Sequence, residues 1–124
     1  MPSTMVEGIH TVIVQTADMD RAVSFFKEVL GLTPGYSSAY WSDFQLGSAR
    51  LGIHPGFGEP PFAIAGKGAV IGISVTNIEE FRGQLESAGE FVRGEFHQTP
   101  SGVVLDFCDP DGNNFQAIEL GKKL

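Results

Sequence analysis

The feature that most constrains this chain is an internal repeat with a constant offset of 59 residues. Thr11 falls on Val70, Asp18 on Asn77 and Met19 on Ile78 at this offset. Each copy begins with a β-branched apolar run, which is followed by apolar residues at helical spacing. A repeated unit of this size cannot bury its own apolar face. The repeat therefore indicates that the two copies, or two chains, pack against each other.

The first copy, residues 8–54, predicts one strand, one helix and three further strands. Asp18 is placed to accept hydrogen bonds from first-turn amides, and Gly31 is free to end the helix with a positive φ. The second strand lies within residues 32–38. Gly47-Ser48 is a two-residue hairpin signal between the last two strands. The predicted elements are the strand Thr11–Gln15, a helix through Met19, Val23, Phe26 and Leu30, and the hairpin strands Tyr40–Leu46 and Ala49–His54.

The second copy, residues 69–120, predicts the same order of elements. Thr76 and Glu79 form a possible capping box at the start of its helix. Residues 55–68 contain four glycines and three prolines, which break both helix and strand, and we predict that they connect the copies. The elements are the strand Val70–Val75, a helix through Ile78, Phe81, Leu85 and Ala88, and the strands Phe91–Gln98, Gly102–Cys108 and Asn114–Leu120.

Size and composition restrict the class of protein. A chain of 124 residues has room for one domain, residues 1–124, and 42% hydrophobic residues indicate a folded core. The net charge of −7 argues against nucleic acid and anionic membranes as partners, because both require a basic face. The single cysteine, Cys108, fits a reducing compartment. The N-terminus shows no secretory signal and no apolar run is long enough to cross a bilayer, so we expect a cytoplasmic protein.

Two motifs resemble the vicinal oxygen chelate superfamily, which includes glyoxalases, bleomycin resistance proteins and extradiol dioxygenases. They are Asp18, Ala22, Phe25 and Phe26 followed by Leu30-Gly31-Leu32, and Asp109-Pro110-Asp111-Gly112-Asn113. The resemblance covers residues 8–120. It implies an α+β fold with two tandem βαβββ modules that form curved mixed sheets around a concave cavity. It also implies a homodimer, in which Phe57 and Phe62 are contact or lid residues. Members include metalloenzymes and metal-free proteins that sequester drugs.

The resemblance implies four places for metal ligands. These places hold Thr11, Gly52, Val70 and Gln116 in this chain. Tight divalent sites use imidazole, carboxylate or thiolate, and none of the four side chains provides one. We therefore expect no catalytic metal and no cofactor.

A metal set shifted along the strands is the competing hypothesis. His10, His54 and Glu119 would form a set of two histidines and one carboxylate, as in non-haem iron enzymes. Strand side chains alternate between faces, so His10 and Glu119 need β-bulges to reach the cavity.

The hairpin separates its side chains into two faces. With Gly47-Ser48 at the turn, Gln45 faces Arg50 and Trp41 faces His54. The apolar face, which we expect under the helix, has Tyr40, Phe44, Leu46, Leu51 and Ile53. The other face has Trp41, Asp43, Gln45, Arg50, Gly52 and His54, and we expect it to line a cavity that binds a flat ligand. The alternative is a merely solvated face.

The same alternation adds further candidates for ligand binding. They are Thr11, Ile13 and Gln15 from the first strand, Val70 and Ser74 from the second copy, and Gln116 and Ile118 from the last strand. Asp106 and Cys108 are also candidates to face the cavity. Gly52 and Gly72 lack side chains and would widen it.

Three functions remain open. The favoured one is metal-independent binding of a small, partly aromatic molecule. The second is a glyoxalase-like or dioxygenase-like enzyme, which would use either the shifted metal set or His54 as a general base oriented by Asp43. The third is a non-catalytic interaction module, because fold alone does not decide function.

Overall fold

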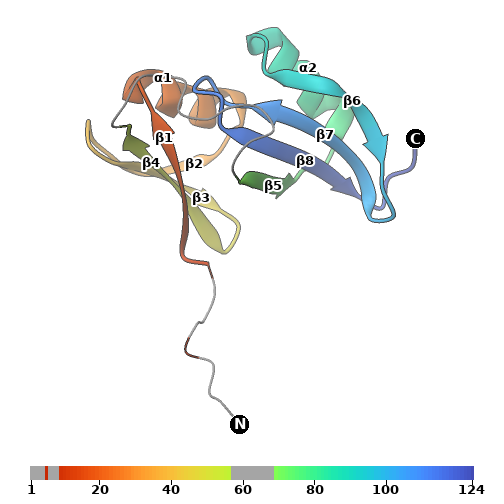
Figure 1. The fold of residues 1–124 in the computed structure, drawn as a ribbon, viewed down its shortest axis with the longest axis horizontal. Coiled ribbons are helices and arrows are strands. Elements are labelled where there is room, and N and C mark those ends of the chain that lie inside the picture. Colours follow the sequence, from red (N-terminus) through yellow and green to blue (C-terminus); the bar gives the residue numbers. More distant parts are fainter. Residues whose placement is uncertain (1–4, 6–8, 57–68) are drawn as a thin grey trace.

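The computed structural model describes residue 5 and residues 9–56 and 69–124 (Figure 1). Residues 57–68 of the predicted connector, with Phe57 and Phe62, lie outside the described residues. The order of elements confirms the repeated βαβββ pattern. The elements are β1 (Thr11–Thr16), α1 (Met19–Ser24), the π-helical η1 (Phe25–Val29), β2 (Thr33–Ser37), β3 (Ser42–Leu46), β4 (Ala49–Pro55), β5 (Val70–Ser74), α2 (Ile78–Ala88), β6 (Val92–Gln98), β7 (Gly102–Cys108) and β8 (Asn114–Leu120).

Each module forms its own four-stranded mixed sheet, which confirms the predicted α+β architecture. The strand orders are β1-β4-β3-β2 and β5-β8-β7-β6, so the first strand of each module lies at an edge. That strand runs parallel to the last strand of its module, and the other pairs are antiparallel. The predicted hairpin register is confirmed, since Gln45 pairs with Arg50 and Ser42 with Ile53.

The two helices begin at equivalent positions of the repeat. Asp18 Oδ1 accepts a hydrogen bond from the Arg21 amide at 3.1 Å, as predicted. Asn77 Oδ1 accepts one from the Glu80 amide at the same distance. The predicted capping box of Thr76 and Glu79 is therefore wrong by one residue. The Asn77 amide oxygen can satisfy an orphan N–H as well as a carboxylate does.

The first helix does not continue as a regular α-helix to Leu30. The Leu30 amide donates to the Phe25 carbonyl at 3.1 Å, a π-type bond to the fifth residue before it. Gly31 then takes a φ of 71°, which a side chain would disfavour, and ends the helical segment.

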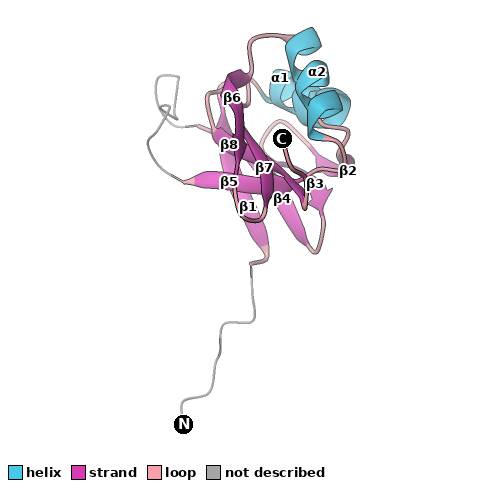
Figure 2. Ribbon diagram, turned by 90° about the vertical axis from the view of Figure 1, so that its right-hand side faces the viewer, coloured by secondary structure: helices cyan, strands magenta, loops and turns pink. Residues whose placement is uncertain are grey.

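Both helices lie on the same side of the strands (Figure 2). Phe26 is fully buried there, with ring centroids 6.0 Å from Phe44 of the first module and 5.9 Å from Phe115 of the second. Tyr40 was expected under the helix but is 81% exposed. It lies before β3, where the Ser38 hydroxyl accepts from the amides of Tyr40 and Trp41 and turns the chain.

The Asp-Pro-Asp-Gly-Asn turn joins the second module to the first. Asp111 is buried, and its carboxylate accepts from the Thr16 hydroxyl at 2.6 Å and from the Ala17 amide at 2.9 Å. Asp109 is buried beside it and accepts from the amides of Asp111 and Asn113. Burial raises the pKa of Asp109 from 3.8 to about 6, against the lowering effect of these hydrogen bonds.

No helix among the described residues is long and apolar enough to cross a membrane.

Candidate functional site

The face of the first sheet opposite the helices has a cluster formed by Trp41, Asp43 and Arg50. The Trp41 indole Nε1 donates to Asp43 Oδ2 at 2.9 Å, and Arg50 Nη1 lies 3.1 Å from Asp43 Oδ1. The Tyr36 amide also donates to Asp43 Oδ1. The indole hydrogen bond is the largest influence on this carboxyl group and lowers the pKa of Asp43, with smaller lowering from Tyr36 and Arg50 against the effect of burial. The structure thus brings three predicted site residues together.

The Trp41 ring lies over Gly52, where the resemblance implies a metal ligand. A Cβ atom built on Gly52 would overlap Cη2 and Cζ2 of this ring, and it would lie 3.1 Å from Thr11 Cγ2. The absence of a side chain at Gly52 therefore accommodates the tryptophan. The expectation that Gly52 widens the cavity is wrong, because the indole fills that space.

Other predicted residues lie around this cluster without joining it. Ile13 is 58% exposed on β1, and Gln15 is also exposed. Gln45 Nε2 donates to the Gly47 carbonyl at 2.6 Å. His54 Nδ1 lies 2.7 Å from the Pro55 carbonyl, and within the described ranges no hydrogen bond joins His54 to Asp43. The geometry does not form the base–carboxylate pair that the enzyme hypothesis requires.

The second sheet has a hollow of about 500 Å³ on its corresponding face. The hollow contains Val70 and Gln116, which are predicted site residues, together with Gly72 and Asp106. Ser74 and Ile118 form the next pair of β5 and β8 on the same face, and they do not line the hollow. The complete lining is Val70, Gly72, Arg93, Asp106, Phe107, Asn114, Phe115 and Gln116.

Two polar pairs lie in this hollow, one that reaches across β7 from β6 to β8 and one between the neighbouring strands β7 and β8. Arg93 Nη1 of β6 donates to Asn114 Oδ1 of β8 at 2.6 Å. Gln116 Nε2 donates to Asp106 Oδ1 at 3.0 Å. The Cys108 thiol is buried nearby, and burial raises its pKa more than the adjacent Arg93 lowers it. Cys108 is therefore held as a neutral thiol.

Arg93 and Asn114 were missed from the sequence. Strand alternation assigns a face only where the register is regular. The pairing of β6 with β7 has an irregularity between Arg93 and His97, which the sequence does not reveal. The basic side chain of Arg93 is a signal that could have drawn attention to β6. Asn114 could have been found by alternation, because it lies two residues before Gln116 in a regular register.

The residues at the implied metal positions do not fit a divalent ion. Thr11 and Gln116 offer only neutral oxygens, Val70 offers none, and the indole covers Gly52. The hypothesis of a shifted metal set formed by His10, His54 and Glu119 is wrong. Glu119 Oε1 accepts from the Ile78 amide at 2.9 Å, at the beginning of α2. Across residues 9–56 and 69–124, which contain His10, His54 and Glu119, no three side chains of His, Cys, Asp or Glu gather as a metal set.

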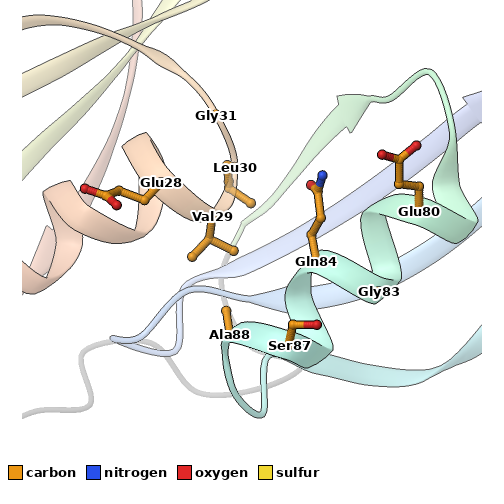
Figure 3. A pocket seen from close by; sticks show the side chains of 9 residues that line it. All are labelled: Glu28, Val29, Leu30, Gly31, Glu80, Gly83, Gln84, Ser87 and Ala88. Atoms are coloured by element: carbon orange, nitrogen blue, oxygen red, sulfur yellow. The ribbon is translucent and has the colours of Figure 1, made fainter.

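A larger groove of about 830 Å³ lies between the end of η1 and α2 (Figure 3). It lies among the helices, and the Glu28 carboxylate points away from α2. Its charged lining residues are the acidic Glu28 and Glu80. Since it has no complementary polar pairs of the kind that cross the sheet hollow, we take the strand faces as the candidate site.

Comparison with known proteins supports the fold. Residues 8–117 match the family model of the Glyoxalase/Bleomycin resistance protein/Dioxygenase superfamily. No curated protein matches the chain. A putative glyoxalase family protein from Bacillus anthracis is 22% identical, with a TM-score of 0.77, over 96% of this chain and 99% of that one.

Two further solved structures have similar folds. TnmS3, an antibiotic binding protein from Streptomyces sp. CB03234, is 19% identical with a TM-score of 0.74, over 96% of this chain and 100% of its own. Lactoylglutathione lyase from Agrobacterium tumefaciens is 18% identical with a TM-score of 0.70, over 94% and 96%. With two βαβββ modules and a family model that spans residues 8–117, the chain belongs to the glyoxalase/bleomycin resistance protein/dioxygenase superfamily.

Proposed function

We propose that the protein binds a small, partly aromatic molecule on the strand faces opposite its helices, without a catalytic metal. The observation on which this depends most is the Trp41 ring over Gly52. A metal ligand at that position would need the space that the indole occupies. The indole instead offers an aromatic surface whose N–H is already bound to Asp43.

The second-sheet hollow supports the same proposal. Its volume of about 500 Å³ lies in the range of small-molecule sites. Its lining combines the exposed apolar side chain of Val70 with a few oriented polar groups, which is the composition that such sites use. TnmS3 is an antibiotic binding protein with a similar fold, and it makes sequestration a reasonable activity for this chain.

We further propose that the site is completed in a homodimer. β1 and β5 are both edge strands, and their apolar residues Ile13 and Val70 are 58% and 56% exposed. A second copy that covers these edges would remove the apolar surface from water and would place another sheet face over the hollow.

Isothermal titration calorimetry with a panel of aromatic metabolites and antibiotics tests the proposal. The protein should be treated with EDTA before the titrations. We expect micromolar binding that is unchanged by the chelator and weakened at least tenfold by Trp41→Ala. Tyr40→Ala is the matched control, because Tyr40 is 81% exposed beside Trp41 and outside the cluster.

Light scattering tests the dimer and should give about twice the mass of one 13.3 kDa chain. No binding across the panel would favour an interaction module. Binding that requires added divalent metal would favour a metalloenzyme. Either result would overturn the proposed function.

A further inference from the structure

Arg93 differs from the other arginines in its partners. The chain has four arginines, and all of them lie in the described residues. Arg21, Arg50 and Arg82 each form an ion pair with a carboxylate. Within this part of the chain, no carboxylate oxygen lies within 4.0 Å of an Arg93 side-chain nitrogen. Among the described residues, Arg93 is thus the arginine that forms no ion pair with a carboxylate.

The neutral partners of Arg93 leave much of its hydrogen-bonding capacity available. A guanidinium has five N–H donors in a fixed planar fork. In the described residues, Arg93 donates to Asn114 Oδ1 at 2.6 Å and contacts the Cys108 sulfur. Its side chain is half-buried, so its charge has lost part of its hydration. Asp106 is its register partner on β7, but within the described ranges it forms no ion pair with Arg93. An anion that enters the hollow would complete this arrangement.

We propose that Arg93 is the specificity-determining residue of the hollow and that it selects ligands with a carboxylate group. This inference rests on the proposed function and names the chemical class of its ligand. The fork of Arg93 matches the two oxygens of a carboxylate, and Asn114 holds the fork by one of its nitrogens. The exposed apolar side chain of Val70, at the edge of the hollow, receives the remainder of the molecule.

The other charge in the hollow favours a singly charged anion. Asp106 lines the same hollow, and its Oδ1 accepts from Gln116 Nε2 at 3.0 Å. A phosphate dianion would meet one cation and one anion there, and its second charge would have no partner. A carboxylate monoanion pairs with Arg93 and brings no second charge against Asp106. The charge count therefore identifies an aromatic carboxylate as the preferred ligand over a phosphate ester.

A matched pair of probes tests the inference: 2-naphthoate and its neutral isostere 2-naphthamide, each titrated by calorimetry. We expect the carboxylate to bind about tenfold or more tightly than the amide, as charge-assisted hydrogen bonds require. Arg93→Gln should remove this difference by weakening naphthoate alone, and Arg93→Lys should restore part of it. Arg82→Gln is the control for net charge, because Arg82 is paired with Glu86 and Glu95 on the helix side.

Asp106→Asn gives a test that does not depend on changing Arg93. Asparagine retains an oxygen that accepts from Gln116, but it removes the negative charge from the hollow. Naphthoate should then bind about two- to fivefold more tightly, while the affinity for naphthamide should not change.

The outcomes separate this inference from the proposed function. Equal binding of the two probes, or loss of both in Arg93→Gln, would overturn the role of Arg93 and leave small-molecule binding intact. Tighter binding of inorganic phosphate than of naphthoate would overturn the preference for a monoanion. If neither probe binds but neutral aromatic molecules do, the inference fails alone. If nothing binds, both fail.

Discussion

Arg21 Nη2 lies 2.8 Å from Asp111 Oδ1, so a carboxylate of the second module is bound to the first helix of the first module. The two partners differ in environment. The Asp111 side chain is fully buried, whereas that of Arg21 is 48% exposed. Asp111 also accepts from Thr16 and Ala17, so it joins three groups of the first module at one point.

Asp111→Ala should lower the free energy of unfolding by about 3 kcal/mol, because it leaves buried donors on the first module without an acceptor. Arg21→Ala should cost less than about 1 kcal/mol, since its exposed charge is screened by solvent. Urea denaturation measures the free energy of unfolding of both variants. Asp20→Ala, an exposed change in the same helix, is the control and should have a small effect. Equal losses for Asp111 and Arg21 would contradict the central role of the buried carboxylate.

Asp109 should make stability depend on pH. Its pKa is about 6 in the folded protein against 3.8 for the free group, so the folded state retains a proton that the unfolded state has lost between these values. This contribution is fully present below about pH 3.8 and is lost as the pH rises through about 6. Asp109→Asn removes the titration but retains an acceptor for the amides of Asp111 and Asn113.

The stability of the wild type relative to Asp109→Asn should therefore be greater at about pH 4.5 than at about pH 7.5, by about 2 kcal/mol. Urea midpoints of the two proteins at both pH values measure this difference. The other carboxylates contribute equally to the stability of both proteins, so their effects cancel in this comparison. A difference that does not change with pH would show that Asp109 is already ionised in the folded protein at the lower pH.

Gly52 and Gly72 form a matched pair for the packing of Trp41. A Cβ on Gly52 would overlap the indole, whereas one on Gly72 would have no heavy atom within 4 Å. Gly52→Ala should destabilise the protein by about 1–3 kcal/mol through overpacking. It should also shift the Trp41 emission to longer wavelength as the ring moves into water. Gly72→Ala should be neutral or slightly stabilising. Emission spectra and urea titrations of the two variants test these expectations. An unshifted emission spectrum in Gly52→Ala would count against the described position of the Trp41 ring.

Trp41→Phe should raise the pKa of Asp43, because the indole hydrogen bond is the largest influence that lowers it. Arg50→Gln should raise it less, since the charge of Arg50 is a smaller contribution than the hydrogen bonds from Trp41 and Tyr36. Carbon-detected NMR titration of the Asp43 carboxyl group measures both shifts. A larger effect of Arg50→Gln would show that charge, and not the indole, controls this carboxylate.

Local patterns in the sequence determined the elements and much of their register. The bounds of β7 and β8, the Asp18 cap and the pairing of Gln45 with Arg50 follow from residues near one another in the chain. These features depend on alternation, turn chemistry and orphan amides, which act over a few residues. The predicted capping box of Thr76 and Glu79 was wrong although it also depends on neighbouring residues. Asn77 competes with Thr76 for the N-cap position, and spacing alone does not rank the two.

Only the tertiary structure decided which side chains meet. The Trp41 ring over Gly52, the path of Arg93 to Asn114 and the bond from Arg21 to Asp111 each join different strands, helices or turns. Strand alternation assigns a face to a residue, but it does not say how far a long side chain reaches along that face or which gap an indole fills. These outcomes depend on the irregular pairing of β6 and on the packing of the two modules, since both are set by contacts far apart in the chain.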